Sequence, residues 1–271
     1  MEVYANAAWP IKIWGDVVPR DGLIDPFGKS PPTRVDKEYE RKVLGTLDTI
    51  YCSQVGRLLL QSLNNTLDIY PYSIQDARES GSQNATTTPK NWDAAGERGT
   101  PLYDNGMPLR LASGDVRRYA TGGGIGSEIH FFPDDWATST VPSNRGLFAS
   151  AGYRRDEVLF HEMAHALMFM AGCDNGSMPP VGFDTKREFW AVMATNIYSS
   201  AWNRPLRKNH QSGSPISQTD ADALYLKYGS MVDWMCRDIP HFTRAVAQLE
   251  WIPFNPFRDS YKRQKAKLSG A

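Results

Sequence analysis

The sequence predicts an α+β fold, in which a small twisted sheet packs on one buried helix and the C-terminal half is mostly helical. Two short segments, residues 67–72 and 127–132, alternate apolar and polar side chains as half-buried strands do. Beyond them, residues 156–170, 185–202 and 218–249 repeat apolar side chains at helical spacing. With 271 residues and 41% hydrophobic content, the chain can bury a sizeable core.

The N-terminal part is expected to be mostly irregular. Residues 1–34 are rich in proline and glycine and have no long periodic pattern, so they predict a strap with at most one short strand, at 10–18. From residue 35 to 271 we expect a single domain. Helical spacing runs through 35–63, where Gly45 and Gly56 weaken the pattern, and leaves open whether one helix or two form.

The middle of the chain is polar and is punctuated by turn signals. Residues 76–126 hold few aliphatic side chains, and Asn105-Gly106 between two extended stretches indicates a hairpin. A proline closes each predicted strand, Pro71 within the first and Pro133 after the second. A loop of this length inside a compact domain is uncommon and is often functional.

The helical half has recognisable ends. Asp156 is expected to cap the first helix and Gly172 to end it, while Pro240 should break the last one. The tail from Ile252 carries a basic cluster, which we interpret as a solvated end of the chain.

Composition limits the partners and the setting of the protein. Thirty basic residues balance thirty acidic ones, so the formal net charge is zero and the basic surface of a nucleic-acid binder is not indicated. The N-terminus lacks the pattern of a signal peptide, and no apolar run is long enough for a membrane span. The three cysteines, Cys52, Cys173 and Cys236, form no CxxC pair and are expected to be reduced thiols.

One motif carries chemistry. Residues 158–168 read VLFHEMAHALM, and His161 and His165 stand four apart, on one face of the predicted helix. Two imidazole nitrogens at this spacing can bind one Zn²⁺, and Glu162 could act on water at the metal without being a ligand. The flanking side chains are apolar, and unpaired His and Glu would be costly to bury among them.

A catalytic zinc usually has three protein ligands. The HExxHxxGxxH pattern is excluded, because Met168 and Ala171 stand where it requires Gly and His. We expect Glu188, which opens the next helical block, to be the third ligand, and hold Asp184 and Asp174 in reserve. The gap of 23 residues from His165 suits a turn and a second helix packed on the first (188 − 165 = 23).

HEMAH followed by Glu188 on a second helix resembles the gluzincin branch of the zincin metallopeptidases. The order of elements over about residues 40–210 is similar to zinc endopeptidase effector domains of bacterial type VI and type III secretion systems. In those, a helix like GRLLLQSLNNT is followed by a strand like LDIYPY, a long loop, an edge strand and HExxH. The resemblance implies a zincin-like fold with Zn²⁺ as cofactor.

The resemblance also implies further roles. The strand before the active-site helix, Ile129–Phe132 here, would form the rim of the cleft, with His130 on that rim, and would pair with substrate as an added strand. For stabilising the oxyanion, His210 is the first candidate and Tyr198 the second, among the residues that follow Glu188. Asn196 could orient a metal ligand.

These observations predict a zinc metallopeptidase acting on a protein or peptide, with Glu162 as general base. The resemblance further implies a secreted effector or toxin, exported by a specialised secretion system and paired with a chaperone or immunity protein. Two alternatives stay open at this stage. One is a zinc amidase that cuts peptidoglycan, and the other is a zinc-stabilised binding module without turnover.

Overall fold

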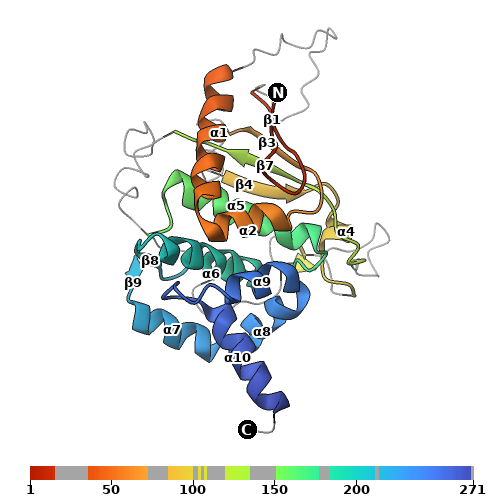
Figure 1. The fold of residues 1–271 in the computed structure, drawn as a ribbon. Helices are drawn as coiled ribbons and strands as arrows, with labels where there is room; N and C mark the ends of the chain where they lie inside the picture. The colour runs from red at the N-terminus through yellow and green to blue at the C-terminus, as the bar shows by residue number, and fades with distance from the viewer. Residues whose placement is uncertain are drawn as a thin grey trace.

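The described part of the protein contains a five-stranded mixed sheet, with helix α5 (Arg155–Met170) beneath it and further helices packed below and beside α5 (Figure 1). Its structure, a computed structural model, describes residues 1–15, 36–72, 85–99, 103–104, 107–108, 120–134, 151–176, 183–210 and 214–269. The α+β class predicted from the sequence is confirmed. In sheet order, the strands are β1 (Glu2–Tyr4), β2 (Ile11–Ile13), β3 (Leu67–Pro71), β7 (Ser127–Phe131) and β4 (Ala85–Pro89).

The position of β4 corrects an expectation about the rim of the sheet. β2, β3 and β7 run parallel, whereas β4 pairs antiparallel with β7, with Ala85 opposite Phe131 and Pro89 opposite Ser127. β7 is therefore an inner strand, and the edge strand beside the helix that carries the HEMAH motif is β4. The sequence reads ATTTP at β4, which is too short and too polar to indicate a strand without its neighbours.

The other strand predictions have mixed outcomes. The strands expected at 67–72 and 127–132 are confirmed as β3 and β7. The first 15 residues supply two strands rather than one, because β1 pairs antiparallel with β2. Flanking the expected hairpin turn, β5 (Tyr103–Asp104) and β6 (Met107–Pro108) pair antiparallel, while the Asn-Gly pair itself lies outside the described residues.

Two helices, rather than one, follow β2. α1 (Lys37–Cys52) begins where the Asp36 side chain accepts hydrogen bonds from two backbone N–H groups of the first turn. Ser53 then ends α1 and caps α2 (Gln54–Ser62) through its side chain. A Cβ on Gly56 would lie 1.9 Å from the carbonyl oxygen of Ile50, so only glycine permits this tight turn between the helices.

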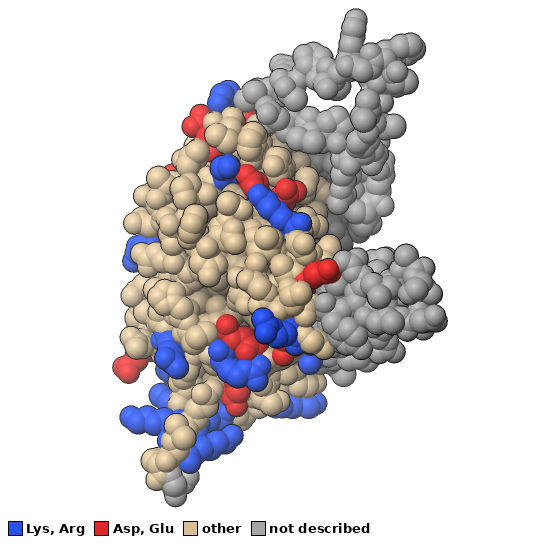
Figure 2. All heavy atoms as spheres, turned by 90° about the vertical axis from the view of Figure 1, so that its right-hand side faces the viewer, with Lys and Arg blue, Asp and Glu red and all other residues tan. Residues whose placement is uncertain are grey.

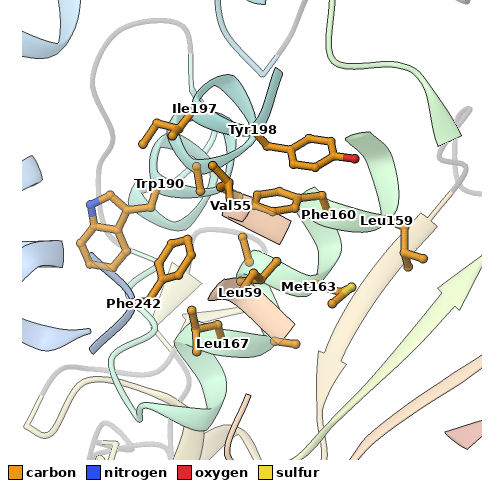
Figure 3. Close-up of a cluster of buried hydrophobic side chains, with 14 of the residues drawn as sticks. Val55, Leu59, Leu159, Phe160, Met163, Leu167, Trp190, Ile197, Tyr198 and Phe242 are labelled. Carbon is orange, nitrogen blue, oxygen red and sulfur yellow. The ribbon is translucent and has the colours of Figure 1, made fainter. Parts of the chain in front are cut away.

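Helix α5 (Arg155–Met170) is the centre of the molecule. It lies between the sheet and α6 (Lys186–Ala201) and also contacts α1 and α2 (Figure 1). All of its side chains from Asp156 to Met170 are buried. Figure 3 shows its apolar side chains meeting those of α2 and α6, with the rings of Phe160 and Tyr198 stacked at 4.5 Å.

The expected C-terminal end of α5 is confirmed, whereas the expected N-terminal cap is wrong. Gly172 follows the helix with φ of +63°, as expected for a helix stop, and packs directly on the backbone of Gly122. The N-terminal cap is Arg154 and not Asp156, whose carboxylate lies inside the first turn. It accepts hydrogen bonds there from Tyr198 Oη at 2.7 Å and Arg204 at 2.6 Å, so it is not free to cap.

The C-terminal part is helical throughout and holds one helix that the sequence did not indicate. The predicted block 218–249 breaks at Pro240 as expected, and also at Tyr228. The tail is a helix, not merely a solvated end, because Asn255 caps it, Phe257 is fully buried, and it packs on the two preceding helices. These elements are α7 (Gln218–Lys227), α8 (Gly229–Asp238), α9 (Pro240–Ala247) and α10 (Pro256–Leu268).

Two smaller features complete the described chain. A four-residue helix, α4 (Trp92–Ala95), contacts α5, and a two-stranded ribbon joins β8 (Leu206–Arg207) to β9 (Pro215–Ile216). Basic side chains gather at the lower end of the molecule, around α10 (Figure 2), where Lys262, Lys265 and Lys267 are exposed. None of the helices within the described ranges is long and apolar enough to cross a membrane.

The close packing at the C-terminal end of α5 can be tested by comparing two glycines, one in a crowded place and one in open space. Gly172→Ala should lower the free energy of unfolding by about 1–3 kcal/mol, because φ is positive and a Cβ would lie 2.6 Å from the backbone of Gly122. Gly45→Ala is the control, since nothing lies within 4 Å of its Cβ position in α1. It should raise that free energy by about 0.5–1 kcal/mol in urea denaturation. Equal effects would contradict the packing described here.

Candidate metal centre

His161 and His165 meet on one face of α5, one helical turn apart. Their Nε2 atoms lie 3.1 Å from each other, and their rings stand nearly perpendicular, at 82°. Both side chains are buried, with 7% and 5% of their surfaces exposed. The helical spacing seen in the sequence therefore places two ligand-type nitrogens at one point, as predicted.

Helix α6 brings Glu188 to the same point. Its Oε2 lies 3.2 Å from Nε2 of His161 and 3.3 Å from Nε2 of His165. Thr185 caps α6 by accepting a hydrogen bond from the backbone N–H of Glu188, which fixes the carboxylate in the first turn. Within the described part of the chain, these three residues form a group whose ligand atoms all lie within 4.8 Å of one another.

The two reserve carboxylates are engaged elsewhere. Asp184 accepts a hydrogen bond from Nδ1 of His210. Asp174 is buried beside Arg187, whose Nε lies 3.3 Å from its Oδ1. Neither belongs to the group with the two histidines, and the structure therefore favours Glu188 among the three.

The electrostatics of the group favour a positive charge at its centre. Burial raises the pKa of Glu188, but the two histidines outweigh it and hold that pKa well below its usual range. Burial likewise lowers the pKa of His165, but the carboxylates of Glu188 and Glu162 outweigh it and leave that pKa raised. His161 is dominated by its burial, which lowers its pKa to about 3.

Glu162 stands beside this group without joining it. The residue is 9% exposed, and burial raises the pKa of its carboxyl above its ordinary value. Its Oε2 accepts a hydrogen bond of 2.6 Å from Oγ1 of Thr87, on the edge strand β4. A carboxylate with a raised pKa is a stronger base, which suits proton abstraction near neutral pH. Nothing in the sequence indicated Thr87.

His210 borders the group from the segment after β8. Its Nε2 lies 3.2 Å from Oε2 of Glu188, and its ring is stacked on that of His161 at 5.9 Å. The other ring nitrogen, Nδ1, is hydrogen-bonded to Asp184. Of the two oxyanion candidates chosen from the sequence, His210 is the one that the structure brings to the site.

The segment that carries His210 is held by two residues. Asn196 of α6 is fully buried and bonds both backbone groups of Arg207: it accepts from the N–H at 2.7 Å and donates to the carbonyl at 2.8 Å. The guanidinium of Arg207 then donates to the carbonyl of His210 and to Tyr153 Oη. Asn196 was expected to orient a metal ligand, and it positions the His210 segment instead.

Two other expectations are corrected. Tyr198 is fully buried, and its hydroxyl donates to Asp156 at 2.7 Å, so it packs in the core and does not reach the site. His130 lies on the inner strand β7 and stacks on Tyr70 of β3 at 5.5 Å. It is therefore not a rim residue, because the rim strand is β4.

The donor set fits zinc in number and type, namely two imidazoles and one carboxylate. The group differs from a complete zinc site in one respect. The Nδ1 atoms of His161 and His165 are buried and lack a hydrogen-bond partner among the described residues. Ligating histidines usually donate that N–H to an acceptor.

Comparison of the chain with family models, with curated proteins and with solved structures finds no match.

The support of His210 can be tested through Asn196. Asn196→Ala should leave the buried N–H and carbonyl of Arg207 without partners, which costs about 1–3 kcal/mol for each unsatisfied group. We expect a loss of that size in urea denaturation of the metal-free protein, together with faster hydrogen exchange at the amide of Arg207. The matched control is Asn64→Ala, at an exposed residue just beyond the end of α2. Unchanged exchange at Arg207 would contradict the role given to Asn196.

Proposed function

We propose that the protein is a zinc-dependent peptidase with a zincin-like fold. The observation that carries the proposal is the meeting of His161, His165 and Glu188 within 4.8 Å, with the buried base Glu162 beside them on the same helix. A purely structural zinc would leave a buried carboxylate next to it without a purpose. The proposal rests on this chemistry and on the resemblance of the HEMAH motif.

Each residue of the centre receives a role. His161, His165 and Glu188 would hold the ion, which when bound polarises the amide carbonyl and lowers the pKa of water to about 7. Glu162 takes the proton of the attacking water and delivers it to the leaving amine. His210 donates a hydrogen bond to the oxygen that becomes negative, and Asp184 keeps its ring in place.

The edge strand β4 is the surface to which we assign the peptide. It ends the sheet in the order of described strands and contacts α5, where Glu162 lies. An edge strand presents unpaired backbone N–H and carbonyl groups, to which an extended peptide can add as a further strand. The role that the resemblance gave to β7 therefore passes to β4. Export as an effector, with a chaperone or immunity protein, remains a proposal from the resemblance.

Metal binding is the first expected outcome. The purified protein should hold about one zinc per chain, and His161→Ala or His165→Ala should lose it, because a site of this type needs three protein ligands. His130→Ala and His241→Ala are matched controls, since neither histidine belongs to the group. Metal content after dialysis measures this, and full retention by both ligand variants would contradict the site.

Substitutions of the three candidate carboxylates test which of them is the third zinc ligand. Glu188→Ala should weaken zinc affinity by orders of magnitude, and Glu188→Gln nearly as much, because the negative charge attracts the cation. Asp184→Ala and Asp174→Ala should change the affinity far less, since neither carboxylate lies in the group. Zinc titrations that rank these variants in the opposite order would show that another carboxylate is the ligand.

Catalysis is tested by Glu162→Gln, which keeps the shape of the side chain and removes the base. This variant should bind zinc and fold like the parent, yet cleave casein or a peptide library at least about 10²-fold more slowly. A chelator should abolish cleavage by the parent, and added zinc should restore it. Assays on purified sacculus distinguish a peptidoglycan amidase from a peptidase.

The same variant tests the biological proposal. Expression of the parent in a target cell should be harmful, and expression of Glu162→Gln should not. If both forms are equally folded and equally toxic, the harm comes from binding, and the zinc is structural.

A further inference from the structure

Thr87 of β4 makes the one hydrogen bond to the Glu162 side chain found among the described residues. Its Oγ1 lies 2.6 Å from Oε2 of Glu162 and 3.1 Å from the backbone carbonyl oxygen of the same residue. A hydroxyl has a single proton to donate. A distance of 2.6 Å is typical of an O–H donor bound to an ionised carboxylate, so the proton belongs to Oε2.

The register of the sheet makes Thr87 unique among three consecutive threonines. Thr87 pairs with Ile129, a fully buried residue, so its side chain faces α5. Thr86 and Thr88 point to the opposite face, because side chains alternate along a strand. One hydroxyl out of three therefore meets the carboxylate of Glu162.

We propose that Thr87 is a positioning residue, which fixes the orientation of the Glu162 carboxylate by occupying Oε2 and leaving Oε1 for the proton. This inference rests on the proposed function for its kinetic consequence, but its structural content stands alone. An unrestrained carboxylate on a flexible Glu side chain samples several rotamers. A base displaced by 1 Å can lose about 10²-fold in rate.

The consequence falls on the chemical step and not on substrate binding. The hydroxyl of Thr87 is engaged by Glu162, so it makes no direct contact with a peptide added along the edge of β4. Glu162 and the strand that we assign to the peptide are thereby joined by a hydrogen bond between β4 and α5. Loss of this bond should lower kcat and leave KM close to its parent value.

The test compares Thr87→Val, Thr87→Ser and the control Thr49→Val, each loaded with zinc and assayed on fluorescent casein. Thr49 is an exposed threonine of α1 whose hydroxyl donates to a backbone carbonyl, so it lies outside both the metal centre and β4. Valine keeps the β-branched shape and strand preference of threonine and removes only the hydroxyl. We expect kcat of Thr87→Val to fall between about tenfold and 10²-fold with KM unchanged. Thr87→Ser and Thr49→Val should stay within about twofold of the parent. In a Glu162→Gln background, Thr87→Val should cause no further loss.

A second measurement does not depend on activity. Crystal structures of the zinc-loaded parent and of Thr87→Val should show one orientation of the Glu162 carboxylate in the parent and a different or divided one in the variant. An unchanged carboxylate, or an equal loss in Thr87→Ser and Thr87→Val, would overturn the proposal. If the zinc-loaded parent cleaves nothing, the proposed function fails, and the two crystal structures still decide the role of Thr87.

Discussion

The burial of His161, Glu162 and His165 within the apolar helix α5 is the constraint on which the rest of the structure depends. Unpartnered polar side chains inside a protein cost several kcal/mol. Two of the elements that pack on α5 supply partners for these side chains: Glu188 comes from α6 and Thr87 from β4. The positions of these two elements therefore orient the polar face of the helix.

The same constraint accounts for the charges at the site. Two histidines and a carboxylate that lie this close in a buried place cannot all keep their usual protonation, so their pKa values move apart. The two rings favour the ionised form of Glu188. A divalent cation would give all three side chains a common partner. The raised pKa of Glu162 belongs to the same environment.

Hydrogen bonds also hold the segment beside His161, His165 and Glu188 in place. Asn196 is hydrogen-bonded to the backbone of Arg207, and Arg207 donates to the carbonyl of His210. His210 is therefore linked to α6, the helix that carries Glu188. Catalytic groups need this kind of support, because small displacements are costly in rate. None of these supporting residues stands in a recognisable motif, since asparagine, arginine and threonine are common wherever a chain is polar.

The sequence by itself determined what is local. The spacing of His161 and His165, the two main helices and the strands β3 and β7 follow from periodicity that short stretches of chain carry within themselves. Only the tertiary structure decided which strand is the edge, that the tail becomes helix α10, and that Tyr198 serves the core. It also placed Glu188, already expected from the sequence, beside the two histidines and left both reserve aspartates outside that group. These choices depend on contacts between segments far apart in the chain, where burial and register, not local spacing, set the free energy.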